Sequence, residues 1–348
     1  MFTRRAWLWT GVVGSGGGPA FAEDRLHALL ANPPASGLIV VQTVRDSPAA
    51  KRGVREGDIL QTYAGTRLTT IQQLLKLIDE HERSQQTVAL GFFRNGKAQT
   101  QQIDAGVMGV RTARVEAGRA KWKPSKPQPY QPDLSGLNGE AWMSYQLAGR
   151  RAGFEWVRFR PTAEGVTSEY KLAFLQGDYE ERFHVVIETE KAGPGRFRTL
   201  RYVSGAKQNQ VVEARRQSGR FTGTRRGKPE ALSATAAVVP SYAIGALATT
   251  LPLREGFLTA FAVFEEANFR LQPGHELVCA RRERLDVLGQ SVETYVFEDR
   301  HYGEPGFRYW VDAKRRLVRT TWGSHTSVLT QKDTVLRTLP SRLADFAK

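Results

Sequence analysis

The sequence contains few of the residues on which metal and redox chemistry depend. Cys279 is the only cysteine among 348 residues, so a disulfide framework within the chain is excluded. Six histidines occur, and none has the spacing at which two histidines bind one metal ion: they are His27, His81, His184, His275, His301 and His325. We therefore expect no metal and no cofactor.

Motifs of known catalytic sites are also missing. Gly14-Ser15-Gly16-Gly17 resembles a serine nucleophile turn, but it lies in the expected leader. His81-Glu82 and His275-Glu276 lack a second histidine four residues after the first. Adjacent acids such as Glu265-Glu266 point to opposite faces of a strand, which does not suit shared acid and base work. We expect no catalytic residue, with a hydrolase whose groups converge from distant positions as an alternative.

What is present is typical of a globular protein, with 41% apolar residues, 24% charged residues, 33 Gly and 16 Pro. At roughly 150 residues per domain, the length predicts two domains. Fifty Lys and Arg against 35 Asp and Glu give a net charge of +15, which favours anionic partners such as peptide carboxylates or an anionic membrane surface. No known nucleic-acid-binding motif accompanies this charge, so we expect no nucleic-acid partner.

Residues 1–22 have the layout of a bacterial signal peptide. Arg4 and Arg5 precede a weak apolar stretch, Ala6–Val13, and Ala20-Phe21-Ala22 forms a small-x-small cleavage site. The apolar stretch is much shorter than the roughly 20 residues of a membrane-spanning helix. The paired arginines resemble a twin-arginine export signal, and the general export route is the alternative. We expect a periplasmic or secreted protein.

Residues 36–118 predict one small domain. An apolar strand begins near Ser36, and Ser47 and Pro48 then open a short helix that ends at Gly53. Ile71, Leu74, Leu75 and Ile78 have helical spacing. Asn95-Gly96 predicts a hairpin between two further strands.

The run SPAAKRGVREGDILQTYAGTRL, followed by a helix and a hairpin, resembles a bacterial PDZ domain, a small α+β barrel or sandwich with two helices. The resemblance implies that a peptide or protein C-terminus binds as an added strand beside the second helix, with its carboxylate on the backbone N–H groups of an apolar-Gly-apolar loop. The sequence before Ser36 has no convincing loop of this form. Gly106-Val107-Met108-Gly109-Val110 matches it directly after the hairpin.

That placement resembles the permuted PDZ domains of site-2-type membrane proteases and HtrA-like proteins. It implies that Val107, Met108, Gly109 and Val110 form the carboxylate loop. The strand from Val110 to Val115, which includes Arg111, would receive the peptide. The resemblance further implies that Ile71 and Leu75 line a pocket for an apolar final side chain. The alternative is a sheet edge that binds no ligand.

Residues 119–133 contain four prolines and three lysines and predict an extended linker. Residues 134–335 then alternate apolar and polar side chains in short stretches, which indicates a mainly antiparallel β domain. One short helix at Ser241–Thr250 lies between Pro240 and Pro252. A sheet this long generally curls or closes, so we expect a barrel or half-barrel around this helix, followed by a C-terminal tail at 336–348.

The β domain resembles periplasmic β-barrel families of unknown function that are related in shape to lipoprotein carriers. The resemblance rests on the helix between two prolines, Gly289–Val296, Phe307–Asp312 and Leu317–Arg319. It implies at most an apolar ligand such as a lipid. The sequence therefore predicts an exported, non-catalytic protein that binds peptide C-termini, with a carrier of a lipid or other apolar ligand as the alternative besides the hydrolase.

Overall fold

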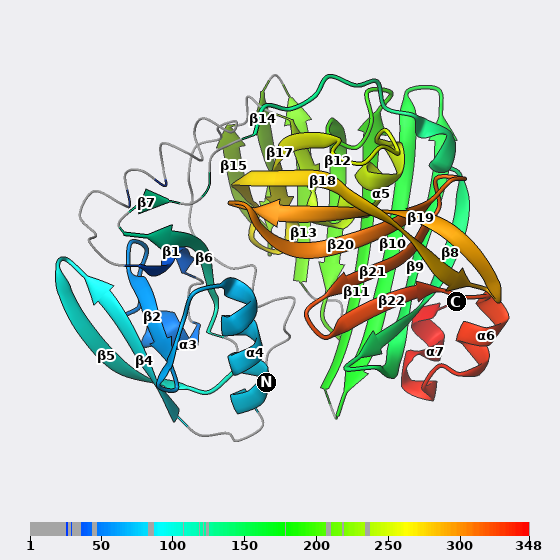
Figure 1. Cartoon of the computed structure of the whole chain (residues 1–348). Coiled ribbons are helices and arrows are strands. Elements are labelled where there is room, and N and C mark those ends of the chain that lie inside the picture. The colour runs from blue at the N-terminus through cyan, green and yellow to red at the C-terminus, as the bar shows by residue number, and fades with distance from the viewer. Residues whose placement is uncertain are drawn as a thin grey trace. The chain divides into compact units, whose positions relative to one another are not determined.

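The computed structural model describes residues 26, 29, 36–43, 47–82, 87–106, 108–117, 119–120, 122, 125–177, 179–206, 210–217, 219–233 and 237–347. They fall into two compact units, one formed mainly within residues 19–124 and one within residues 125–300 and 305–348 (Figure 1). Of the helices in these ranges, none is both long enough and apolar enough to cross a membrane. The expected leader, residues 1–22, lies outside the described residues.

The first unit is built on one sheet with the strand order β5-β4-β2-β1-β6-β7, and β3 pairs with β2. Its strands are β1 (Gly37–Thr43), β2 (Ile59–Tyr63), β3 (Thr66–Arg67), β4 (Thr87–Arg94), β5 (Lys97–Asp104), β6 (Val110–Glu116) and β7 (Arg119–Ala120). Its described helices include α3 (Pro48–Lys51) and α4 (Ile71–Glu82).

Local sequence signals explain where these elements begin and end. The Ser47 side chain accepts the N–H of Ala50 at 3.1 Å, and Pro48 occupies the first turn of α3. Thr70 accepts the N–H of Gln73 at 3.2 Å and so caps α4. Asn95 and Gly96, with φ of 48° and 77°, form the two-residue turn between β4 and β5.

Both faces of the sheet are covered. On one face, α4 contributes Leu74, Leu77 and Ile78 to a core that includes Leu38 and Leu60. The other face packs a second apolar cluster, which includes Leu26, Ile39, Ile59, Ala113 and Val115. Strand β1 is therefore apolar on both sides, which explains its unbroken hydrophobic run.

The expected linker, residues 119–133, divides in the structure. Arg119 and Ala120 form β7, which pairs with the end of β6. Residues 125–133 have no regular secondary structure, but their backbone is bonded to the second unit. The N–H of Ser125 donates to Glu276 at 2.8 Å, and that of Asp133 donates to the carbonyl of Thr250 at 3.0 Å.

The second unit is a 15-stranded sheet with the order β15-β14-β13-β12-β11-β10-β9-β8-β22-β21-β20-β19-β18-β17-β16. The ladder between β16 and β17 is parallel. The strands are β8 (Gly139–Leu147), β9 (Arg150–Thr162), β10 (Gly165–Gln176), β11 (Tyr179–Glu190), β12 (Phe197–Ser204), β13 (Gln210–Gln217), β14 (Arg220–Arg225), β15 (Lys228–Ser233), β16 (Val238–Pro240), β17 (Leu258–Glu265), β18 (Arg270–Val287), β19 (Gln290–His301), β20 (Glu304–Asp312), β21 (Leu317–Trp322) and β22 (His325–Leu329).

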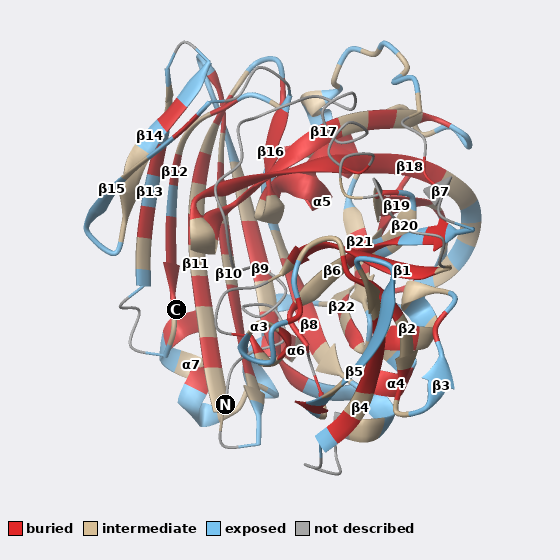
Figure 2. Cartoon of the chain, turned by 90° about the vertical axis from the view of Figure 1, so that its left-hand side faces the viewer, coloured by how far each residue is buried: buried red, intermediate tan, exposed pale blue. Residues whose placement is uncertain are grey.

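This sheet curls around one short helix, as the alternating pattern and the two prolines predict. Helix α5 (Ile244–Thr250) follows the 3-10 turn η2 (Ser241–Ala243), and all of its residues are buried (Figure 2). Ala246 packs with Val166 of β10. A side chain at Gly245 would instead meet Tyr309 and Leu317, from β20 and β21. Strands from both halves of the sheet therefore contact the same helix.

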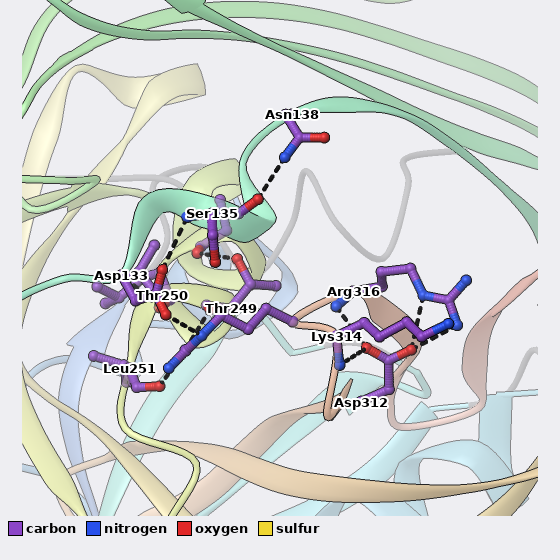
Figure 3. Close-up of polar contacts among 12 residues, drawn as sticks. Asp133, Ser135, Asn138, Thr249, Thr250, Leu251, Asp312, Lys314 and Arg316 are labelled. Atoms are coloured by element: carbon purple, nitrogen blue, oxygen red, sulfur yellow. Dashed lines mark hydrogen bonds and ion pairs between the residues drawn. The ribbon is translucent and has the colours of Figure 1, made fainter.

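The end of α5 is held by polar contacts that Figure 3 shows at close range. Arg315 donates from Nη1 to the carbonyls of Thr249 and Leu251, at 3.0 and 2.8 Å. Its Nε also pairs with Asp133 at 2.6 Å. Asp133 in turn accepts the N–H of Ser135 and caps the 3-10 turn η1 (Leu134–Gly136). Carbonyls that lack partners at a helix C-terminus are thus satisfied by a cation.

Residues 336–348, which the sequence led us to expect as a tail, are largely helical. Helix α6 (Lys332–Arg337) is followed by α7 (Ser341–Ala347). Leu343 and Phe346 are buried and pack with Trp142 and Phe154, in a cluster on β8 and β9. The C-terminal segment is therefore part of the core of the second unit.

Candidate functional site

The candidate carboxylate loop joins β5 to β6, and glycine geometry shapes it. Gly106 and Gly109 have φ of 113° and 70°, a region that residues with a Cβ rarely adopt. The N–H of Gly106 donates to the hydroxyl of Tyr63 at 3.3 Å. Val107 lies outside the described residues. The two glycines let the chain turn sharply just before it enters β6.

Met108 anchors the same loop to the core. Its side chain is 1% exposed, and its carbonyl accepts the N–H of Ala49, in α3, at 3.1 Å. Within the described part of the chain, the N–H groups of Met108 and Gly109 donate to no backbone or side-chain acceptor. Neighbouring N–H groups of this kind can form a concavity that binds a carboxylate.

Strand β6 is positioned to accept a further strand over part of its length. One edge pairs with β1, from Thr43 opposite Val110 to Gly37 opposite Val115. On the other edge, the described pairing with β7 involves only Val115 and Glu116. The segment of β6 nearest the loop therefore has no second strand among the described residues, which is the condition for β-strand addition.

The two faces of β6 differ in their surroundings. Val110 packs against the core that contains α4, whereas Ala113 packs on the opposite face. Because side chains alternate along a strand, Thr112 lies on the face of α4 and Arg111 on the other. Thr112 is 2% exposed, and its hydroxyl has no hydrogen-bond partner in the structure. The side chain of Arg111 therefore points away from α4, and in a peptide site on the α4 side Arg111 would take part through its backbone N–H and carbonyl groups.

The two predicted pocket residues lie on α4 at positions that differ from those of its core residues. Ile71 and Leu75 are half-buried, whereas Leu74 and Ile78 are buried. Residues spaced by four share one side of a helix, so Ile71 and Leu75 form an apolar strip at the boundary of the core. Contact between this strip and a peptide side chain stays a prediction.

The second unit contains a buried polar cluster that the sequence did not reveal. Glu266 is 2% exposed, and its carboxylate accepts the hydroxyl of Ser241 at 2.5 Å and the N–H of Tyr242 at 3.2 Å. Burial raises the pKa of Glu266 to about 7. A carboxyl group in this state can hold or release a proton near neutral pH.

Aromatic rings gather around Tyr242, whose N–H donates to this carboxyl group. Tyr242 has ring contacts of 6.4 Å with Tyr170, 6.1 Å with Tyr202 and 6.0 Å with Phe183. Burial raises the pKa of Tyr170 and of Tyr202, so both hydroxyls stay protonated at neutral pH. The rings come from β10, β11, β12 and η2, so neither a motif nor a fixed spacing could have predicted the cluster.

Two further buried acids, Glu265 and Asp299, have partners of their own. Glu265 forms a buried ion pair with Arg270 and accepts the side-chain amide of Gln272 at 2.8 Å. Asp299 lies 2.8 Å from His275, and both are buried. Glu265 is the last residue of β17 and Glu266 is the first of the 3-10 turn η3 (Glu266–Asn268), so the two acids do not lie on one strand as the sequence led us to expect. No described group of three or more His, Cys, Asp or Glu residues is arranged to hold a metal ion.

A comparison with protein-family models finds the PDZ domain at residues 22–104. This range contains β1 to β5 and α4, and it ends before Gly106. No curated protein matches the chain.

Among solved structures, the chain is similar to the crystal structure of a β-barrel-like protein of the domain of unknown function DUF1849 from Brucella abortus. The two share 11% sequence identity, with a TM-score of 0.39. The likeness covers 56% of this chain and 97% of the other.

Proposed function

From a PDZ domain at residues 22–104, we propose that the protein is an exported, non-catalytic binding protein that captures peptide or protein C-termini. In this proposal the domain is permuted, so that the carboxylate loop at Gly106–Val110 follows the hairpin. The single observation that carries the proposal is the unpaired N–H groups of Met108 and Gly109 at the start of an incompletely paired strand. We place this function in the bacterial periplasm or outside the cell.

Affinity and selectivity come from different parts of this site. Backbone pairing along β6 supplies affinity for any extended chain, and the loop N–H groups add the requirement for a free carboxylate. Ile71 and Leu75 supply the preference for an apolar final residue because burial of an aliphatic side chain contributes roughly 1.5–3 kcal/mol.

The test is a binding measurement on the chain from Glu23 onward with a library of peptides that end in a free carboxylate. We expect micromolar binding by peptides with an apolar last residue, and at least tenfold weaker binding by the same peptides with an amidated end. Leu75→Lys places a charge on the apolar strip and weakens binding. Glu80→Gln changes the net charge equally on an exposed part of α4 and leaves binding unchanged. Absence of binding by every peptide refutes the proposal.

The second unit favours one alternative, a carrier of a lipid or other apolar ligand. Its supporting observation is the half-buried Tyr242, which lies among Tyr170, Phe183 and Tyr202. Solvent extraction of the purified protein, followed by mass spectrometry, tests this alternative, since a carrier retains stoichiometric ligand. Extraction of no ligand together with peptide binding leaves the PDZ site as the functional one.

A further inference from the structure

The turn between β14 and β15 gathers positive charge at one exposed point of the second unit. Its sequence is Arg225-Arg226-Gly227-Lys228, and the last three of these residues are exposed. Arg225 pairs with Glu230 at 3.0 Å. Arg226 and Lys228 form no ion pair with a described residue. Three cations against one acid therefore leave the turn with a net charge of +2.

The fold holds these cations together although their placement does not favour stability. Arg225 lies directly opposite Lys228 in the ladder between β14 and β15. Like charges in opposite positions of two strands repel each other. Arg226 has a φ of 51°, and asparagine suits this position of a two-residue turn better, as Asn95-Gly96 in the first unit illustrates. Neither Arg226 nor Lys228 is thus explained by the needs of the fold.

The surroundings of the turn do not compensate its charge. The N–H of Arg226 donates to the carbonyl of Val211 on β13 at 2.9 Å, which fixes the turn beside the start of that strand. Residues 205–209, which precede β13, contain a lysine and no acid. Glu213, the one acid of β13, pairs with Arg201 at 3.6 Å. The acids of β13 to β15 are thus already paired, and an external anion is left to balance the turn.

The side chains around the turn indicate which kind of anion fits it. Phe221 is the only aromatic residue between positions 210 and 233, and it is fully buried. No exposed ring is therefore available there to stack on a nucleic-acid base. A hairpin turn is convex, so it presents its cations to a plane of anions and does not enclose a small ion. An anionic phospholipid surface has this form.

We propose that the turn Arg225–Lys228 docks on an anionic phospholipid surface. The guanidinium of Arg226 and the ammonium of Lys228 contact headgroup phosphates through charge-assisted hydrogen bonds. No exposed large apolar side chain lies in β14 or β15, so the contact stays at the level of the headgroups and weakens as salt screens it. This site is independent of the peptide site on β6.

The first experiment is flotation of the chain from Glu23 onward with vesicles. Vesicles of phosphatidylglycerol mixed with phosphatidylcholine are compared with vesicles of phosphatidylcholine alone, at low and at high salt. We expect binding only to the vesicles that contain phosphatidylglycerol, and loss of that binding at high salt. Absence of binding at low salt, by a chain whose circular dichroism is that of a folded β protein, overturns the proposal.

Paired variants separate the turn from the net charge of the protein. Arg226→Asn with Lys228→Gln removes two cations from the turn and should weaken binding at least about tenfold. Because this double variant also relieves the positive φ and the like-charge pair, its midpoint of thermal unfolding should be no lower than that of the wild-type protein. Arg215→Gln with Arg220→Gln is the matched control, since it removes the same charge from exposed positions near the other ends of β13 and β14. The control should bind vesicles within about twofold of the wild-type protein, because salt screens charges that are far from the contact.

Two outcomes of these comparisons overturn the proposal. Equal weakening by the two double variants shows attraction by net charge alone. Binding of duplex DNA that depends on Arg226 and Lys228, while vesicles stay unbound, assigns the turn to nucleic acid instead.

Discussion

Ser241 donates its hydroxyl to the carboxylate of Glu266 at 2.5 Å, and this contact links two segments 25 positions apart. The same carboxylate accepts the N–H of Tyr242, so Glu266 holds the turn η2 from which α5 continues. Glu266 is itself in the turn η3 (Glu266–Asn268), after β17. Among the described residues, α5 is the one α-helix inside the curled sheet. The turn that leads into it is held by a single buried acid, Glu266.

This arrangement predicts a pH dependence of stability. Burial raises the pKa of Glu266 to about 7 in the folded chain, from the ordinary value of 4.5. The folded state therefore binds more protons than the unfolded state between these values, and stability falls as the pH rises from about 4.5 to 7. The full effect is on the order of 3 kcal/mol.

Urea unfolding of the wild-type chain and of Glu266→Gln at several pH values measures this effect. The glutamine can keep the acceptor for Tyr242 but cannot ionise, so the difference between the two proteins should grow in favour of the variant from pH 5 to pH 8. Parallel curves would show that Glu266 does not titrate in this range.

A buried ion pair in the first unit gives a second prediction. Arg94 donates to Asp58 from Nε at 2.6 Å and from Nη2 at 2.5 Å, and Asp58 also accepts the N–H of Arg55. Asp58 is 1% exposed. Asp58→Asn should reduce the free energy of unfolding of this unit by about 2–3 kcal/mol, because charge-assisted bonds to a buried group are lost.

The control for this prediction is an exposed ion pair in the same unit. Asp104 lies 3.6 Å from Arg52, with both side chains well exposed. Asp104→Asn should change the free energy of unfolding by less than about 1 kcal/mol. An equal loss in both variants, measured by urea unfolding, would contradict the role given to Asp58.

Arg315 provides a third prediction, since it bonds to the carbonyls at the end of α5 and to Asp133. Its φ of 60° favours glycine, so Arg315→Gly relieves strain while it removes the contacts. We expect Arg315→Gly to lower the midpoint of thermal unfolding nonetheless. Asp133→Asn, which leaves the carbonyl contacts intact, should lower it less. A higher midpoint for Arg315→Gly would show that strain outweighs the contacts.

Much of the first unit follows from local sequence because its signals act over a few residues. Ser47 and Pro48 determine the start of α3, and Asn95-Gly96 determines the turn of a hairpin. Gly109 can likewise be identified from its neighbours, because the apolar-Gly-apolar pattern at Gly106–Val110 is a local signal. Whether its loop binds a carboxylate depends on which N–H groups stay unpaired, and only the folded chain shows this.

The buried contacts of the second unit could not be predicted in this way. Glu266 meets Ser241, and Tyr242 meets Tyr170 and Tyr202, because the sheet brings together residues that are far apart in the sequence. Helix α7 is different, since its signal was available. Leu343, Phe346 and Ala347 stand at positions i, i+3 and i+4 after Pro340, which is the spacing of a helix with one apolar side.

Helix α7 therefore gives a fourth prediction, that the C-terminal segment stabilises the second unit. Leu343 is fully buried, and it packs in the same cluster as Trp142 and Trp156. Leu343→Ala should reduce the free energy of unfolding by about 2–5 kcal/mol, through lost burial and the cavity left behind. Leu336→Ala is the control, because that side chain is 40% exposed and should cost less than about 1 kcal/mol. Tryptophan fluorescence during urea unfolding reports on this cluster directly, and equal midpoints for the two variants would show that α7 contributes no more than an exposed leucine does.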